Sequence, residues 1–177
     1  MGKYLITGRG GSGKSTVGHS LFERGYNSFD SDEIPGLARA EDLSGKPTDV
    51  DWSKFVDYSA ISFNWQGQVL RAFLTDHPDI FICGSASNQL DFHSLFDSVF
   101  VLVVDKATHK QHLTDRVSEY GKDPAMLAYL LDEQQAFTEQ ALRLGAIAID
   151  ATHTPEQTTD EIIGHIHDMP KMARTSS

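Results

Sequence analysis

The sequence has almost no cysteine, no long apolar run and no repeat or low-complexity stretch. The single cysteine, Cys83, excludes an internal disulfide framework and fits a reducing compartment. No apolar run approaches the length of a membrane-spanning helix, and the first residues lead directly into "KYLIT" without a signal-peptide pattern. These absences predict a cytoplasmic protein that does not bind a membrane.

Basic residues are also scarce, since 15 Lys and Arg stand against 25 Asp and Glu for a formal net charge of −10. This charge argues against a broad nucleic-acid surface, although it allows a local basic pocket. The length of 177 residues and the hydrophobic share of 40% suit one domain with a sizeable core. We therefore expect a single domain over residues 1–168 and a frayed tail over 169–177.

Short apolar runs alternate with segments of helical periodicity along the chain. Strands are predicted at 3–7, 26–30, 80–84, 98–104 and 146–150. Helices are predicted at 14–24, 55–74, 108–120, 124–143 and from 155 onward, where Thr154, Pro155 and Gln157 form a capping box. Residues 34–51, rich in Gly, Pro, Asp and Ser, are predicted to form a loop or short irregular helix. The alternation favours an α/β fold with a parallel sheet.

Ligands of open parallel sheets bind at the carboxyl ends of the strands. Asp30, Gly84, Asp105 and Asp150 each end a predicted strand, so all four are expected to face one crevice. Several other residues are expected to have structural or surface roles. Val17, Leu21 and Phe22 are predicted on the inner face of the first helix, Trp65 and Cys83 in the core, and the eight histidines on the surface.

The segment Thr7–Thr16, "TGRGGSGKST", matches G-x-x-x-x-G-K-[ST] between a predicted strand and a predicted helix. Glycines let consecutive backbone N–H groups point inward around a phosphate, and the following helix adds the positive end of its dipole. Lys14 is predicted to contact the β- and γ-phosphates, and Ser15 to ligate Mg²⁺. Arg9 is expected to be a solvated charge at the rim. The predicted nucleotide-binding residues of this P-loop are Gly8, Gly10, Gly11, Ser12, Gly13, Lys14, Ser15 and Thr16.

Three classes of P-loop protein are compatible with a chain of this kind. A GTPase would show an N-K-x-D tetrad, whereas "VDKAT" at 104–108 has Asp and Lys in the reverse order. A motor or AAA-type ATPase would show adjacent acids after an apolar strand, whereas Asp105 is followed by Lys106. The chain is also too short for the helical domain that such ATPases add. A small-molecule kinase is the remaining class.

Several segments resemble the adenylate-kinase-like group of P-loop kinases, especially its shikimate-kinase and gluconate-kinase side. They are the N-terminal P-loop, "FDSDEI" (29–34), "IFICGSAS" (80–87), "VFVLVVDKATHKQHLTDR" (99–116) and "AIDATHTPEQTTDEII" (148–163). The chain is also similar to short bacterial chains described as kinases or AAA-family ATPases of this group. The resemblance implies a three-layer P-loop NTPase fold with a five-stranded parallel sheet, helices on both faces and a small lid at about 117–124. It also implies an acceptor-binding segment at about 33–75, with ATP and Mg²⁺ as cofactors.

The resemblance assigns Asp30 to Mg²⁺, through water, and Asp32 to the acceptor hydroxyl. Acids two residues apart on an extended segment face the same side, and a carboxylate can orient an alcohol and accept its proton. Capping of a turn by Ser31 or Asp32 is the alternative. The resemblance also assigns Arg116 to the adenine or the phosphates. Lys122 either reaches the transferring phosphoryl group and the substrate or is a solvated loop charge.

The acceptor side departs from the familiar patterns. The G-E-x-x-F-R segment of shikimate kinases has no counterpart, and "GSASNQ" at 84–89 lacks the arginine that nucleoside-monophosphate kinases carry after the third strand. Gly84, Ser85 and Asn88 are predicted substrate contacts that suit a hydroxyl-rich or base-like molecule, although ordinary turn chemistry explains them equally well. Arg39 is a further predicted substrate contact and would suit an anionic molecule.

The function predicted from the sequence is ATP- and Mg²⁺-dependent phosphoryl transfer to a hydroxyl of a small metabolite. Its predicted catalytic residues are Lys14, Asp32 and Arg116. The alternative is a regulatory nucleotide-binding ATPase without a small acceptor. A nucleoside, nucleotide or polynucleotide-end kinase is a third reading, and the net charge disfavours its nucleic-acid form.

Overall fold

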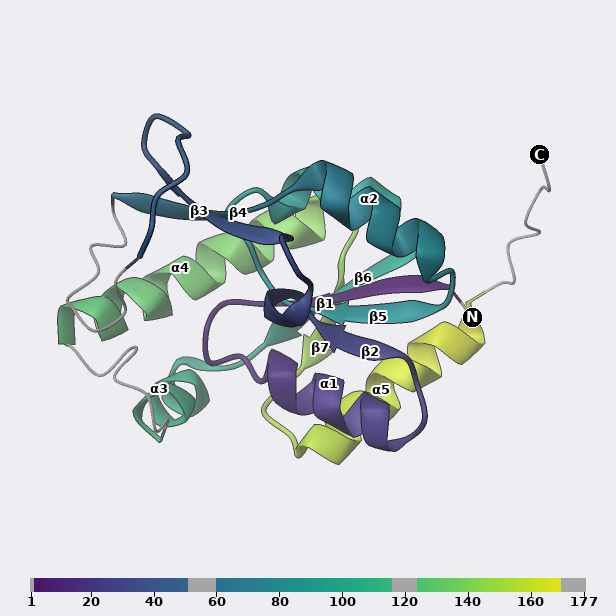
Figure 1. Cartoon of the computed structure of the whole chain (residues 1–177). Coiled ribbons are helices and arrows are strands. Elements are labelled where there is room, and N and C mark those ends of the chain that lie inside the picture. The colour runs from purple at the N-terminus through teal and green to yellow at the C-terminus, as the bar shows by residue number, and fades with distance from the viewer. Residues whose placement is uncertain (1, 51–59, 116–123, 170–177) are drawn as a thin grey trace.

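The computed structural model describes residues 2–50, 60–115 and 124–169 and is built around a parallel sheet (Figure 1). Its strand order is β2-β5-β1-β6-β7, with β1 at the centre. Ile6 of β1 pairs with Cys83 of β5 on one side and with Phe100 of β6 on the other. The strands are β1 (Lys3–Thr7), β2 (Ser28–Asp30), β5 (Ile80–Cys83), β6 (Ser98–Val103) and β7 (Ile147–Asp150). The sequence prediction of a five-stranded parallel sheet is confirmed.

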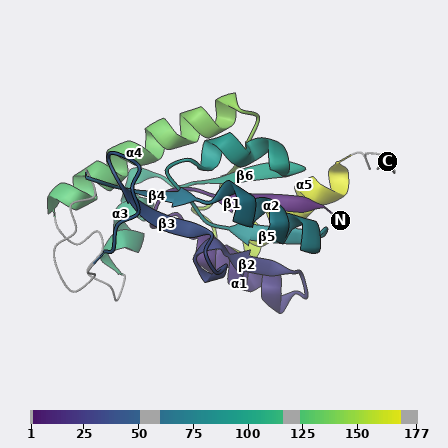
Figure 2. The same ribbon diagram turned by 45° about the horizontal axis from the view of Figure 1, so that its top comes forward.

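Helices cover both faces of the sheet, which gives three layers (Figures 1 and 2). One face packs α2 (Gly67–Asp76) and α4 (Pro124–Arg143) onto strand residues such as Leu5 and Val101. The opposite face packs α1 (Lys14–Glu23) and α5 (Pro155–Asp168) onto strand residues such as Ile6 and Phe100.

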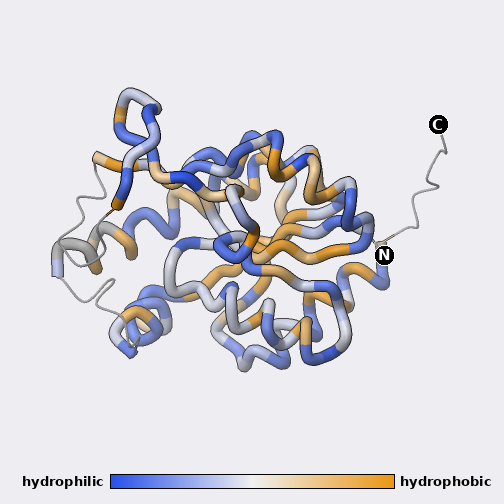
Figure 3. The backbone as a smooth tube through the Cα atoms, viewed as in Figure 1, coloured by the Kyte–Doolittle hydropathy of each residue, from blue (hydrophilic) through white to orange (hydrophobic). Residues whose placement is uncertain are grey.

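Apolar residues occupy consecutive positions in the central strands because both faces of each strand are buried, as the hydropathy colouring of Figure 3 shows. Cys83 lies in this core, as predicted, and burial raises the pKa of its thiol to about 12. The thiol therefore stays protonated at neutral pH and packs as a small apolar group.

An antiparallel hairpin follows β2, where the sequence predicted a loop and the start of a long helix. It consists of β3 (Ala38–Asp42) and β4 (Ile61–Trp65), so the predictions of an irregular segment at 34–51 and of a helix from 55 to 74 are wrong there. Helix α2 begins only at Gly67. The pairing joins residues about twenty positions apart, and only three of the ten strand residues are β-branched or ring-bearing, so neither strand was evident alone.

The remaining boundaries follow recognisable local signals. Helix α5 begins with the predicted capping box, in which Thr154 and Gln157 exchange hydrogen bonds with each other's backbone N–H groups. Helix α3 (Lys106–Thr114) starts two residues earlier than predicted because Asp105 accepts hydrogen bonds from the backbone N–H groups of Ala107 and Thr108. The predicted inward position of Phe22 is wrong, since its side chain is 65% exposed on α1.

The carboxyl ends of the strands face α3 and the β3–β4 hairpin, which lie on the left of Figure 1. Two short 3₁₀ turns, η1 (Ser31–Glu33) and η2 (Gln89–Leu95), follow β2 and β5 at this edge. The P-loop after β1 lies there as well. None of the described helices combines the length and the apolar character that crossing a membrane requires.

Candidate functional site

The P-loop connects β1 to α1 through a backbone that only glycine adopts readily. Gly11 and Gly13 have φ angles of 90° and 96°, in the left-handed region that penalises residues with a side chain. Gly13 is the N-cap of α1 and has no side chain that could accept from the first amides of the helix. These amides and the positive end of the helix dipole form a site suited to an anion.

The ammonium group of Lys14 lies against this loop. Its Nζ donates to the carbonyl oxygens of Gly8 at 2.8 Å and Arg9 at 3.1 Å. Ser12 is fully buried beside Gly8, and its hydroxyl has no hydrogen-bond partner among the described residues. A lysine charge and an unpartnered donor within one loop supply the polar groups that a phosphate requires.

Two carboxylates from the end of β2 meet the start of α1. Ser15 Oγ donates to Asp30 Oδ2 at 2.9 Å, and Asp30 Oδ1 accepts from the backbone N–H of Asp32 at 3.0 Å. Asp30 is thereby the N-cap of η1, a role that the sequence alternative gave to Ser31 or Asp32. Partial burial of its carboxyl group, followed by the negative charge of Asp30, raises the pKa of Asp32, although Lys14 opposes the shift.

The chemistry of Ser15 and Asp30 fits Mg²⁺. A hydroxyl and a carboxylate, already within 2.9 Å of each other, are the hard oxygen donors that this ion takes together with waters and phosphate oxygens. Within residues 2–50, 60–115 and 124–169, no cluster of three or more His, Cys, Asp or Glu forms a metal site made of protein alone. The donor set therefore fits an ion that is shared with a nucleotide.

A pocket of about 370 Å³ opens beside the P-loop. Its walls come from the loop, the end of α3 and the segment between β7 and α5. The lining residues are Gly11, Ser12, Gly13, Thr16, Val17, His112, Asp115, Ala151, His153, Pro155 and Thr158. The volume and the mixture of apolar and polar walls suit a nucleotide base and its ribose.

Arg9 is not the solvated rim charge that the sequence predicted. Its guanidinium group pairs with Glu133 of α4 and lies over the ring of Phe137, with 5.2 Å between the guanidinium carbon and the ring centroid. The side chain of Gln134, from the same helix, accepts from the backbone N–H of Arg9 at 3.3 Å and donates to Leu102 O at 3.2 Å. Helix α4 thus fixes one side of the P-loop, a role that no sequence pattern indicated.

The expectation that the histidines lie on the surface is wrong for two of them. His109 is 1% exposed, and its Nε2 lies 2.7 Å from Gly10 O. His93 in η2 is 9% exposed, and neither of its ring nitrogens has a hydrogen-bond partner among the described residues. His112 is half-buried, and its Nδ1 lies 3.0 Å from Gly11 O. The i, i+3 spacing of His109 and His112 signalled a shared helix face, but not its contact with the P-loop.

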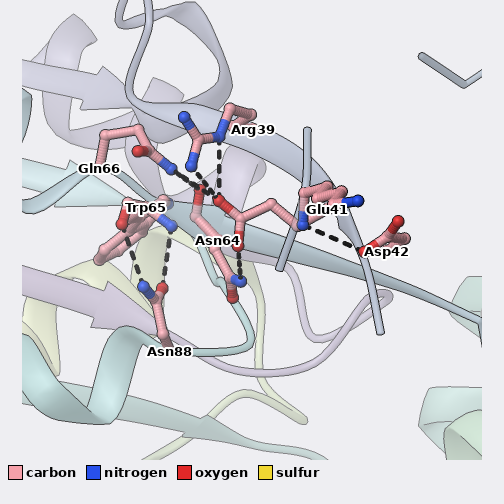
Figure 4. Close-up of polar contacts among 8 residues, drawn as sticks. Arg39, Glu41, Asp42, Asn64, Trp65, Gln66 and Asn88 are labelled. Atoms are coloured by element: carbon pink, nitrogen blue, oxygen red, sulfur yellow. Dashed lines mark hydrogen bonds and ion pairs between the residues drawn. The ribbon is translucent and has the colours of Figure 1, made fainter. Parts of the chain in front are cut away.

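In the β3–β4 hairpin, which carries the predicted substrate contact Arg39, side chains bind one another, as Figure 4 shows. Arg39 donates to Glu41 Oε1, while Asn64 donates to Glu41 Oε2 at 2.7 Å. Hydrogen bonds from Asn64 and Arg39 lower the pKa of Glu41, so this carboxylate stays charged and neutralises Arg39. The structure does not bring Arg39 to the P-loop as a free cation, and its role as a substrate contact stays a prediction.

Asn88, another predicted substrate contact, holds the hairpin against the loop after β5 (Figure 4). Its Oδ1 accepts from Trp65 N at 2.9 Å, and its Nδ2 donates to Trp65 O at 3.0 Å. Trp65 itself is 2% exposed, which confirms its predicted place in the core. The amide group of Asn88 therefore ties the hairpin to the loop after β5 through the backbone of β4.

Gly84 and Ser85 follow β5 beside the acid pair. A methyl group on Gly84 would lie 1.9 Å from Ser31 Oγ, so the turn bearing Asp30 and Asp32 packs directly onto this glycine. Ser85 is half-buried in the same segment. The close packing of Gly84 is the observed reason for a glycine at this position.

Asp30, Gly84, Asp105 and Asp150 all follow strands at the same edge of the parallel sheet, and their sharing of one crevice stays a prediction. The carboxylates of Asp105 and Asp150 accept hydrogen bonds from the nearby residues Thr108 and Thr152. Arg116, Lys122 and residues 117–123 of the predicted lid lie outside the described residues.

The fold matches those of solved small-molecule kinases. Shikimate kinase from Acinetobacter baumannii in complex with shikimate aligns with a TM-score of 0.64 and 17% identity over 94% of this chain and 93% of that chain. Deoxyadenosine kinase from M. mycoides with the products dCMP and a flexible dCDP bound aligns with a TM-score of 0.55 and 15% identity. This alignment covers 95% of this chain and 100% of that chain. A gluconokinase from Sinorhizobium meliloti 1021 aligns with a TM-score of 0.52 and 13% identity over 94% of this chain and 95% of that chain.

No family model and no curated protein matches the sequence. At these identities the structural likeness shows the fold, which is that of the P-loop kinases, as the resemblance of the sequence implied.

Proposed function

We propose that the protein is an ATP- and Mg²⁺-dependent kinase that transfers the γ-phosphoryl group to a hydroxyl of a small metabolite. The observation that carries the proposal is the contact between Ser15 and Asp30. This contact brings the acid pair at the end of β2 to the mouth of the P-loop. There Asp32 lies within electrostatic range of Lys14, the residue that faces the phosphates in this motif.

The donor would bind through this chain's own loop. The amides at the start of α1 and the ammonium of Lys14 would hold the phosphates, and the pocket beside His112 and Pro155 would hold the base. Ser15 and Asp30 would hold Mg²⁺, which neutralises phosphate charge when bound.

Asp32 would act on the acceptor. Its carboxylate would accept the proton of the acceptor hydroxyl as the oxygen bonds to the γ-phosphorus and the bond to the departing ADP breaks. A raised pKa suits this task, because a base whose pKa lies closer to the working pH takes the proton more readily.

The hairpin favours an uncharged hydroxyl compound over an anion as acceptor. Arg39 is neutralised by Glu41, and the polar side chains nearby include the amides of Asn64 and Gln66, whose nitrogens donate to Glu41. Neutral amides pair with hydroxyl groups without the desolvation cost of an unpaired charge. This argument leaves nucleosides among the candidate acceptors.

The test is an ATP-consumption screen against sugars, sugar acids, amino-alcohols, shikimate and nucleosides. Lys14→Ala serves as the blank, and Lys110→Ala, which removes an exposed lysine from α3, serves as the matched control. We expect one acceptor class to stimulate consumption in the wild type and in Lys110→Ala, with no stimulation in Lys14→Ala. Consumption at one rate with every acceptor would contradict the proposal and favour the regulatory ATPase.

A further inference from the structure

Two histidines of α3 contact the backbone at the crest of the P-loop. His109 Nε2 lies 2.7 Å from Gly10 O, and His112 Nδ1 lies 3.0 Å from Gly11 O. A carbonyl oxygen only accepts, so each of these ring nitrogens carries a hydrogen and donates it. Two consecutive peptide carbonyls are therefore held by side chains from a separate helix.

These contacts fix which way the amides of the loop point. Because the peptide unit is planar and trans, a carbonyl held toward α3 directs the next N–H to the opposite side. The Gly10 carbonyl sets the N–H of Gly11, and the Gly11 carbonyl sets the N–H of Ser12. The N–H of Ser12 donates to Arg9 O at 3.1 Å, the same oxygen that receives Lys14 Nζ, so the contact of His112 supports a hydrogen-bonded turn within the loop.

Helix α3 also packs closely against Gly11 of the loop. A methyl group on Gly11 would lie 2.9 Å from the side chain of Leu113 and 3.0 Å from the ring of His109. Gly11 also has a φ of 90°, which other residues rarely adopt. Backbone conformation and helix contact thus reinforce each other at one residue.

We propose that His109 and His112 are positioning residues that hold the P-loop backbone in its observed conformation and so set its affinity for the phosphate chain of the donor. The inference rests on the nucleotide-binding part of the proposed function. It does not depend on the identity of the acceptor or on phosphoryl transfer. Because α3 already orders the backbone of the loop, the entropic cost of ordering it does not reduce the affinity for phosphate.

The two histidines donate through different nitrogens, which gives each a specific replacement. The side-chain amide of Gln reaches about as far as Nε2, so His109→Gln retains a donor toward Gly10 O. The amide of Asn reaches about as far as Nδ1, so His112→Asn retains a donor toward Gly11 O. Leu at either position keeps bulk and removes the donor. His167→Leu, at an exposed position near the end of α5, is the matched control.

The experiment measures dissociation constants for ATP and for inorganic tripolyphosphate, which has no base, well below the unfolding temperature of every variant. Loss of one such hydrogen bond is expected to weaken binding by about 3- to 10-fold. We expect this loss for both ligands in His109→Leu and His112→Leu. His109→Gln, His112→Asn and His167→Leu should bind nearly as the wild type does.

Three results would overturn the inference: wild-type affinity in a folded His112→Leu, equal losses in His112→Asn and His112→Leu, or a loss for ATP without one for tripolyphosphate. The last result would assign His112 to contact with the base, since this residue also lines the pocket. Because His112 is half-buried, its variants test the proposal even where His109→Leu fails to fold. Normal binding without transfer to any acceptor would contradict only the kinase proposal.

Discussion

The P-loop, which we propose binds the phosphate donor, and the β3–β4 hairpin, which we propose faces the acceptor, are built on different principles. They are called the donor side and the acceptor side below. The donor side is a backbone device, in which the amides of the P-loop are oriented by glycines and by contacts from α3 and α4. The acceptor side is a side-chain device, in which Glu41 collects the polar groups of the hairpin and Asn88 ties it to the sheet. A site made of backbone amides can bind the same chemical group in many proteins, because every residue but proline has an amide. A site made of side chains depends on the sequence of one protein and on its ligand.

The acid pair joins the two sides, and breaking it is expected to give the largest effect. Asp32→Asn should lower phosphoryl transfer by roughly 10²- to 10⁴-fold, because the amide cannot accept the proton of the acceptor hydroxyl. ATP affinity should change little, since the donor is held by Lys14 and the loop. Transfer rates and ATP dissociation constants measure the two effects. Transfer near the wild-type rate would show that Asp32 is not the base, and Asp76→Asn, at the exposed end of α2, is the control.

A methyl group on Gly84 should break the acceptor side with less effect on the donor side. Gly84→Ala would place this group 1.9 Å from Ser31 Oγ and 3.3 Å from the ring of Trp65. Overpacking of this kind costs about 1–3 kcal/mol. We expect a lower free energy of unfolding in urea and a larger loss of transfer than of ATP affinity, because Ser31 lies between the two acids.

The control for that change is Gly164→Ala in α5, where an added methyl group meets no atom within 4 Å. Alanine should stabilise this exposed helix position by about 0.4–1 kcal/mol, since it restricts the unfolded chain. Equal stability changes in the two alanine variants would show that the packing of Gly84 against Ser31 is unimportant.

The donor side could be predicted from sequence because its signals are local. The P-loop motif, the apolar strands and the capping box at Thr154 each occupy a few consecutive residues, and the structure has all of them. The hairpin could not be predicted in this way. Its strands are about twenty residues apart, and Glu41 is 8% exposed, a place where sequence patterns lead one to expect an apolar residue.

The contacts of α3 and α4 with the P-loop could not be predicted from the sequence either, because they also join distant residues. Arg9 and Gln134 are 125 positions apart, and a lone arginine in a glycine-rich loop is most simply interpreted as solvated. His109 and His112 were expected on the surface with the other histidines. A contact between a helix and a loop backbone leaves no trace in composition, because any backbone carbonyl can accept.

The smallest expected effect concerns pH and His93 in η2. Burial lowers the pKa of His93 from its ordinary value of 6.5, whereas His109 and His112 of the donor side donate to the P-loop. Above pH 6.5 His93 is neutral in both the folded and the unfolded chain and has no linked effect. As the pH falls below 6.5, the unfolded chain takes up a proton that the fold resists, and stability declines until the lowered pKa of the folded state is passed.

His93→Leu should therefore remove part of the stability loss between neutral and mildly acidic pH. The difference from the wild type should amount to a few degrees of Tm at most, because the effect of a single partly buried imidazole is small. Tm measured against pH for the wild type, His93→Leu and the exposed His167→Leu tests this. Parallel curves for the wild type and His93→Leu would mean that water or a neighbouring group already satisfies the His93 ring.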